Sequence, residues 1–150
     1  MKKSLLMNHK GITLVELVIV VVIIAIGAVL MVPSIGAWLP YYRLTSGTRD
    51  LVSTMRVAQM KAISNNLRYQ ISFISNNSYV LQYQNTGGGW VNDGATQTLP
   101  KGIQLNTTFG NSAAFFPDSS STNGNVVLNN TKGKTKTIQL FGVTGRIKSG

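Results

Sequence analysis

A single carboxylate, Glu16, lies near the start of a long apolar stretch. That stretch covers residues 12–32 and otherwise contains one Thr, one Gly, one Met and aliphatic residues. An ionised side chain in the middle of a bilayer costs about 2.5–3.5 kcal/mol on insertion scales. A chain that keeps such a group is expected to use it, so Glu16 is the first candidate functional residue.

Residues 1–11 precede this stretch as a polar, basic leader that ends in Gly11. The titratable side chains of the leader are Lys2, Lys3, His9 and Lys10. A helix of residues 12–32, at about 1.5 Å per residue, is about 30 Å long and matches one bilayer core. Because the basic residues all precede the stretch, the positive-inside rule predicts a cytoplasmic N-terminus and places the remainder on the other side of the membrane.

Two simpler interpretations of this N-terminus are a secretory signal peptide and a plain single-pass anchor. The apolar stretch is longer than a typical signal-peptide core, and no A-x-A-like cleavage site follows it. A plain anchor fits the length but leaves Glu16 without a role.

The segment 10–17, Lys-Gly-Ile-Thr-Leu-Val-Glu-Leu, resembles the prepilin signature of type IV pilins and type II secretion pseudopilins. The resemblance implies that a prepilin peptidase cuts between Gly11 and Ile12, and that Ile12 becomes an N-methylated first residue. It also implies that Glu16 neutralises the N-terminal amine of a neighbouring subunit, since pairing two charges on assembly removes the cost of burying each alone. Most members have Phe at the position of Ile12.

Residues 33–66 are expected to continue the helix on the far side of the membrane. Pro33 stands where pilins commonly have a helix-distorting proline, so the resemblance implies a role for it in assembly. The apolar spacing then becomes four, three and four, which predicts a buried helix face. The residues of this face are Leu51, Met55, Ala58 and Ala62, and those predicted for the opposite, solvated face are Arg49, Asp50, Arg56 and Lys61.

From residue 67 onward, strand patterns replace helix patterns. Predicted strands cover residues 69–75, 79–83, 97–105, 113–116, 125–128, 135–141 and 143–148. Trp90 follows three glycines and is expected to pack on the domain. The predicted fold class is α+β and type IV pilin-like: a long N-terminal helix, its first half transmembrane, packs on a C-terminal antiparallel β-sheet domain of residues 67–150.

The C-terminal half resembles the GspH/FimT branch of the pilin family. The resemblance rests on Phe116-Pro117 before a Ser/Gly-rich loop, on strands 125–128 and 137–140, and on Gly142-Val143-Thr144-Gly145-Arg146. It implies a minor pseudopilin or minor type IV pilin, a structural subunit at or near the tip of a type II secretion pseudopilus or type IV pilus. The implied partners are other pilin subunits through the N-terminal helix, the prepilin peptidase and the inner-membrane assembly platform.

A basic tail keeps a second function open, that of a DNA-binding minor pilin of the FimT type acting in natural transformation. The tail has no acidic residue after Asp118, and such a cluster binds phosphates or is simply a solvated basic surface. Family members commonly end in Gly-Arg-x-Arg, where this chain has Gly145-Arg146-Ile147-Lys148. The candidate DNA-binding residues are Lys132, Lys134, Lys136, Arg146 and Lys148.

The composition argues against an enzyme. The chain has no Cys, which excludes disulfides and thiolate metal sites and points modestly to a minor subunit, since many major pilins carry a disulfide. Removal of the leader takes away the only His and lowers the formal charge from +10 to +7. The four carboxylates show no paired spacing for acid–base catalysis, so we expect no catalytic residue, metal or cofactor.

Overall fold

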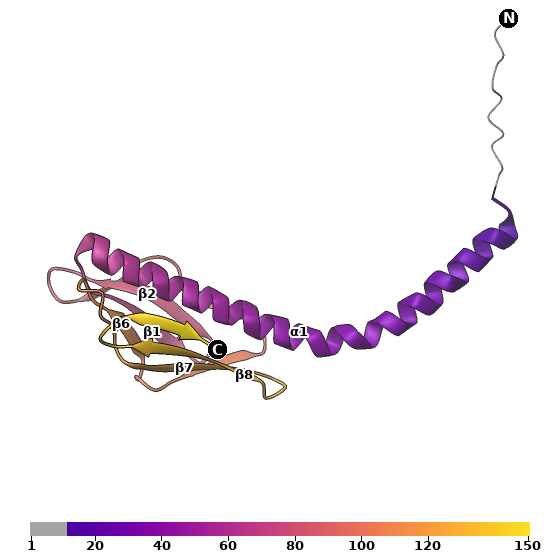
Figure 1. Ribbon diagram of the computed structural model, residues 1–150. Coiled ribbons are helices and arrows are strands. Elements are labelled where there is room, and N and C mark those ends of the chain that lie inside the picture. Colours follow the sequence, from indigo (N-terminus) through magenta and orange to yellow (C-terminus); the bar gives the residue numbers. More distant parts are fainter. Residues whose placement is uncertain (1–11) are drawn as a thin grey trace, which may run out of the picture. The chain divides into compact units, whose positions relative to one another are not determined.

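The computed structural model describes residues 12–150, except for the side chains of residues 30–35 and 37. The chain forms two compact units that divide between Ala37 and Trp38. Helix α1, Leu14–Asn65, contributes residues to both units, and the nine strands found in residues 12–150 belong to the second (Figure 1). The second half of the helix therefore belongs to the same unit as the sheets.

In the first unit, α1 begins with a capping interaction. The Glu16 backbone N–H donates to the Thr13 hydroxyl at 3.2 Å, and the Leu17 N–H donates to the Thr13 carbonyl at 3.1 Å. The large apolar side chains between Ile12 and Val29 are exposed, from 48% to 78%. Among the residues that the structure describes, no helix is both long and apolar enough to cross a membrane.

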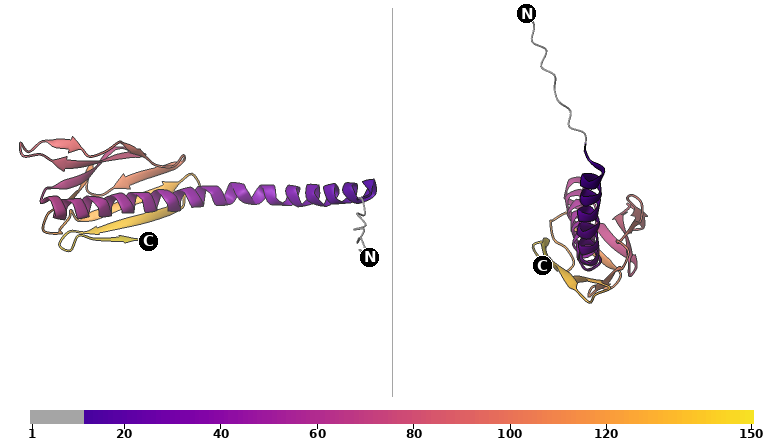
Figure 2. Two further views of the ribbon diagram at one scale, coloured as in Figure 1. Left: turned by 90° about the horizontal axis from the view of Figure 1, so that it is seen from above. Right: turned by 90° about the vertical axis from the view of Figure 1, so that its right-hand side faces the viewer.

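The second unit contains two antiparallel sheets, which the helix covers (Figures 1 and 2). The first has the order β3-β2-β1-β6, with β4 also paired to β2, and the second has the order β5-β7-β8-β9. The strands of the first sheet are β1 (Tyr69–Ser75), β2 (Ser78–Gln84), β3 (Trp90–Asn92), β4 (Gln97–Thr98) and β6 (Ser112–Phe115). Those of the second are β5 (Ile103–Thr107), β7 (Gly124–Asn130), β8 (Thr135–Phe141) and β9 (Arg146–Ser149).

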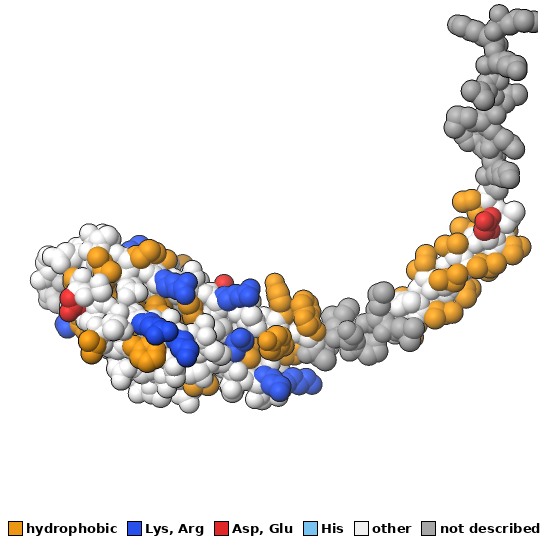
Figure 3. Space-filling model, in the orientation of Figure 1, with side chains coloured by type: hydrophobic (Ala, Val, Ile, Leu, Met, Phe, Trp, Pro, Cys, Tyr) orange, Lys and Arg blue, Asp and Glu red, His pale blue; other side chains and the backbone are white. Residues whose placement is uncertain are grey.

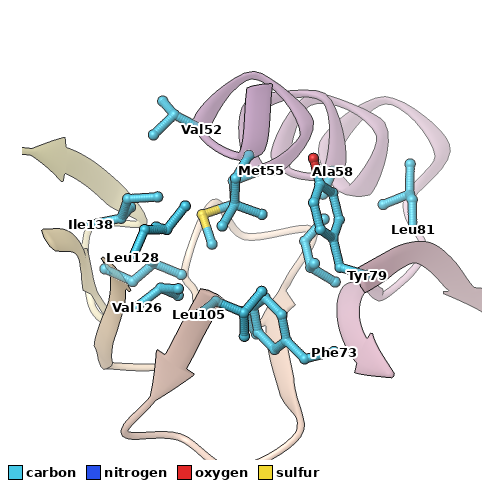
Figure 4. Packing of buried hydrophobic residues seen from close by; sticks show 14 of the residues in the cluster. Val52, Met55, Ala58, Phe73, Tyr79, Leu81, Leu105, Val126, Leu128 and Ile138 are labelled. Carbon is cyan, nitrogen blue, oxygen red and sulfur yellow. The ribbon is translucent and has the colours of Figure 1, made fainter. Parts of the chain in front are cut away.

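The core lies between α1 and both sheets. Met55 is fully buried, and its side chain points between Ile138 and Leu128 of the second sheet and Tyr79 of the first (Figure 4). The apolar spacing of four, three and four brings one helix face onto this core. All four residues predicted for that face are fully buried, which confirms the predicted amphipathic packing: Leu51, Met55, Ala58 and Ala62.

The predicted α+β class is confirmed, with a long helix packed on antiparallel sheets. β1 and β2 form a hairpin, and the helix ends at Asn65, one residue before the predicted end. Asn66 follows the helix with a φ of 52°, a left-handed conformation that Asn tolerates and that stops a helix.

Two local predictions were wrong. The predicted strand 97–105 is two strands in different sheets, because Pro100 cannot donate to a ladder and Gly102, with a φ of 84°, turns the chain. The predicted strand 143–148 begins only at Arg146, because residues 142–145 form a turn. Trp90 starts the edge strand β3, which pairs with β2, and its side chain is 39% exposed.

Candidate functional site

The N-terminal motif is described from Ile12 onward, and the predicted cleavage residue Gly11 lies outside the described residues. Glu16 lies exposed in the first turn of α1, three residues after the capping Thr13. Thr-x-x-Glu is the spacing of a capping box, and a carboxylate in the first turn is also stabilised by the positive end of the helix dipole. The sequence analysis did not predict this capping role for Glu16, although the Thr-x-x-Glu spacing indicates it.

The helix surface that follows Glu16 is apolar and uncovered within its own unit. The large apolar side chains from Leu17 to Val29 are 48% to 72% exposed. A helix that is apolar all round is stable only when lipid or other protein covers it. Pro33 lies inside α1, but its side chain is not among those described.

The five basic residues predicted as one DNA-binding cluster lie in three places. In the β8–β9 ladder, Phe141 pairs with Arg146 and Gln139 with Lys148, so these four side chains share the outer face of the sheet. Lys136 lies two residues before the buried Ile138, so both side chains are on the sheet face that points to the helix. Lys132 and Lys134 lie in the β7–β8 turn, where their backbone N–H groups both donate to the Asn130 side chain at 3.0 Å.

A side chain of α1 holds the turn before β9. The Gln59 amide donates to the Gly145 carbonyl at 3.1 Å and to the Ser119 carbonyl at 3.4 Å. Gly145 is buried and has a φ of 58°, and a Cβ there would overlap the Ser119 carbonyl oxygen. The helix therefore fixes where β9, with Arg146 and Lys148, begins.

Basic side chains spread over the face of the globular unit that Figure 3 shows. Three of the chain's cations line one hollow of about 460 Å³ between α1 and the β8–β9 end of the second sheet. We call this hollow the cationic groove; it is lined by Arg49, Arg56, Lys136, Val52, Thr45, Thr48, Ser53 and Ser149. Sequence reasoning assigned Arg49 and Arg56 to a solvated face and missed the groove, because Lys136 joins them only through the tertiary fold.

A second hollow of about 250 Å³ adjoins the groove and shares Thr45 and Arg49 with it. We call it the aromatic hollow; its lining is Trp38, Tyr41, Tyr42, Thr45, Ser46, Arg49 and Asp50. The rings of Trp38 and Tyr42 stack with centroids 5.1 Å apart.

Three titratable side chains outside the cationic groove contribute to the packing of the globular unit. Lys61 and Asp93 form an ion pair at 2.7 Å, and the hydrogen bond to Asp93 raises the pKa of Lys61. Burial raises the pKa of Tyr79. Within the described residues, no group of three or more His, Asp or Glu side chains could hold a metal ion.

The fold is that of solved pilin-like proteins. The minor pseudopilin EpsH from the type 2 secretion system of Vibrio cholerae has a TM-score of 0.63 at 10% identity, over 72% of this chain and 96% of its own. The type IV minor pilin FimU of Pseudomonas aeruginosa has a TM-score of 0.59 at 13% identity, over 71% of this chain and 92% of its own. No curated protein matches the sequence.

A long helix packed on antiparallel sheets, behind a methylation motif, defines a type IV pilin-like subunit. Residues 6–32 match the prokaryotic N-terminal methylation motif, and residues 47–144 match the family described as type II transport protein GspH. Because the second match covers more than half of the chain, the protein belongs to the GspH family.

Proposed function

We propose that this chain is a minor pseudopilin or minor type IV pilin, a structural subunit placed at or near the tip of a type II secretion pseudopilus or type IV pilus. The observation that carries the proposal is Glu16, exposed at the start of a helix whose apolar side chains are also exposed. An apolar helix of this kind is stable only when lipid or protein surrounds it, and a carboxylate that is buried with it requires a cationic partner. A neighbouring subunit supplies both through its own helix and N-terminal amine.

The proposed path to the filament begins in the bacterial inner membrane. Residues 12–32 anchor the chain with its N-terminus in the cytoplasm and its globular unit in the periplasm. The prepilin peptidase then cuts between Gly11 and Ile12, and Ile12 is methylated. The match of residues 6–32 to the methylation motif supports this processing, and the inner-membrane assembly platform is the next proposed partner.

The proposal is tested by separating the charge of Glu16 from its place in the capping box. Glu16→Gln removes the charge, yet Gln is accepted at the same position of a capping box. Thr13→Ala is the matched control, because it removes the hydroxyl that accepts the Glu16 N–H and leaves the carboxylate in place. Incorporation of the full chain into sheared filaments is measured beside its amount in the membrane.

We expect Glu16→Gln to remain in the membrane fraction but to be lost from the filaments, whereas Thr13→Ala is still incorporated. Equal incorporation of Glu16→Gln and the unchanged chain would refute the pairing role. Equal loss in both variants would show that Glu16 matters only for the start of the helix.

The second candidate function is DNA binding by the end of the tail. Arg146 and Lys148 share one face of β9, and the Arg146 guanidinium lies 5.9 Å from the centroid of the Phe141 ring. Cations beside an aromatic ring are common in sequence-independent nucleic-acid sites. Duplex DNA titrated onto the detergent-solubilised chain would then bind with a log–log salt slope near −0.9 per phosphate contacted. Replacing Arg146 and Lys148 by Gln would remove the binding, and replacing Lys101 would not.

A further inference from the structure

The aromatic hollow and the cationic groove form one continuous surface on α1, because Thr45 and Arg49 line both. We propose that this surface docks an acidic segment of a different filament subunit. The inference rests on the proposed assembly into a filament and names the chemistry of the neighbour at this face.

The residue types at this surface are those that dominate protein interfaces. Trp, Tyr and Arg carry most of the binding free energy where interfaces have been scanned by alanine. Trp38, Tyr41 and Tyr42 are 58%, 54% and 54% exposed, so their rings are available to a partner. Stacking of Trp38 on Tyr42 holds two of these rings together, which lowers the entropy cost of binding.

The charges of the groove require a negative partner. Arg49, Arg56 and Lys136 line one hollow, and none of them forms a salt bridge with any residue that the structure describes. Cations gathered around one hollow repel one another, and carboxylates placed between them relieve that repulsion.

A second copy of this chain does not supply that partner. From residue 38 onward the chain has eleven basic residues against three carboxylates, Asp50, Asp93 and Asp118. Asp93 is paired with Lys61, Asp118 accepts hydrogen bonds from Ser120, and Asp50 lines the aromatic hollow itself. Two copies meeting at this face would bring cations against cations, so the complement is another, acidic protein. Since α1 is the element through which the proposed assembly takes place, that protein is a neighbouring subunit.

The test places a photo-crosslinking amino acid at Tyr42 of the full chain in its native host and identifies the crosslinked peptide by mass spectrometry. We expect a peptide rich in Asp or Glu from a different protein that has an N-terminal methylation motif. The double change Arg49→Glu and Lys136→Glu should lower the crosslink yield at least about tenfold, because it places like charges against the partner. The matched control, Lys132→Glu with Lys134→Glu, makes the same change of net charge in the β7–β8 turn and should leave the yield unchanged.

Circular dichroism of both charge variants confirms that they fold, and incorporation into filaments is scored in the same cells. A crosslink between two copies of this chain, to nucleic acid or to phospholipid would overturn the inference. So would equal loss in the two charge variants, which would mean general attraction to a basic protein, or the absence of any crosslink from an incorporated chain. A chain that never enters the filament would instead contradict the proposed function itself.

Discussion

The buried turn at Gly145 gives the sharpest prediction for the fold. An alanine there must adopt a φ of 58°, and a left-handed conformation costs an L-residue about 1–2 kcal/mol. Its Cβ must also displace the Ser119 carbonyl, which is backbone and cannot rotate away. Overpacking of this kind costs about 1–3 kcal/mol more. We therefore expect Gly145→Ala to lower the free energy of unfolding by about 2–5 kcal/mol.

Gly133 provides a matched control for this substitution. It has a φ of 73°, and a Cβ there would meet no atom within 4 Å, so Gly133→Ala isolates the cost of the left-handed conformation. Urea denaturation followed by circular dichroism compares the two variants at unchanged m-value. Equal destabilisation by the two alanines would refute the proposed overlap with Ser119 and the fixed position of β9.

Three further predictions concern the core and the titratable groups. Met55→Ala should lower the free energy of unfolding by about 2–5 kcal/mol in the same assay, because Met55 is fully buried between both sheets. The pKa values of Tyr79 and Lys61 are raised in the folded state. The stability that these two groups contribute is therefore complete below about pH 10 and is lost as the pH rises through the raised pKa values. In thermal melts, the melting temperature of Tyr79→Phe should fall less at alkaline pH than that of the unchanged chain. Asp93→Asn should cost less than about 1 kcal/mol in urea, because the ion pair with Lys61 is partly exposed.

The elements with strong local periodicity could be predicted from the sequence. Spacings of four, three and four along the helix identified the core face, and strand patterns identified the positions of β1 and β2. These signals are local, because each depends on residues close together in the chain. The strand predictions failed where Pro or Gly turns the chain. Pro100 and Gly102 take the chain from one sheet to the other, and Gly145 ends a turn inside the predicted last strand.

The candidate site was only partly predictable for the same reason. The motif around Glu16 is contiguous and could be read directly, whereas the groove joins Arg49 and Arg56 to Lys136 from a strand eighty residues later. The predicted basic cluster also ignored strand alternation, which sends Lys136 and Lys148 to opposite faces of the sheet.

Intact-mass spectrometry of the chain in sheared filaments tests the proposed function most directly. The prediction is a subunit that begins at Ile12 with one added methyl group, present in the filament fraction and lost from it in the Glu16→Gln variant. A chain that still begins at Met1, that is cut after residue 32, or that stays only in the membrane would contradict it.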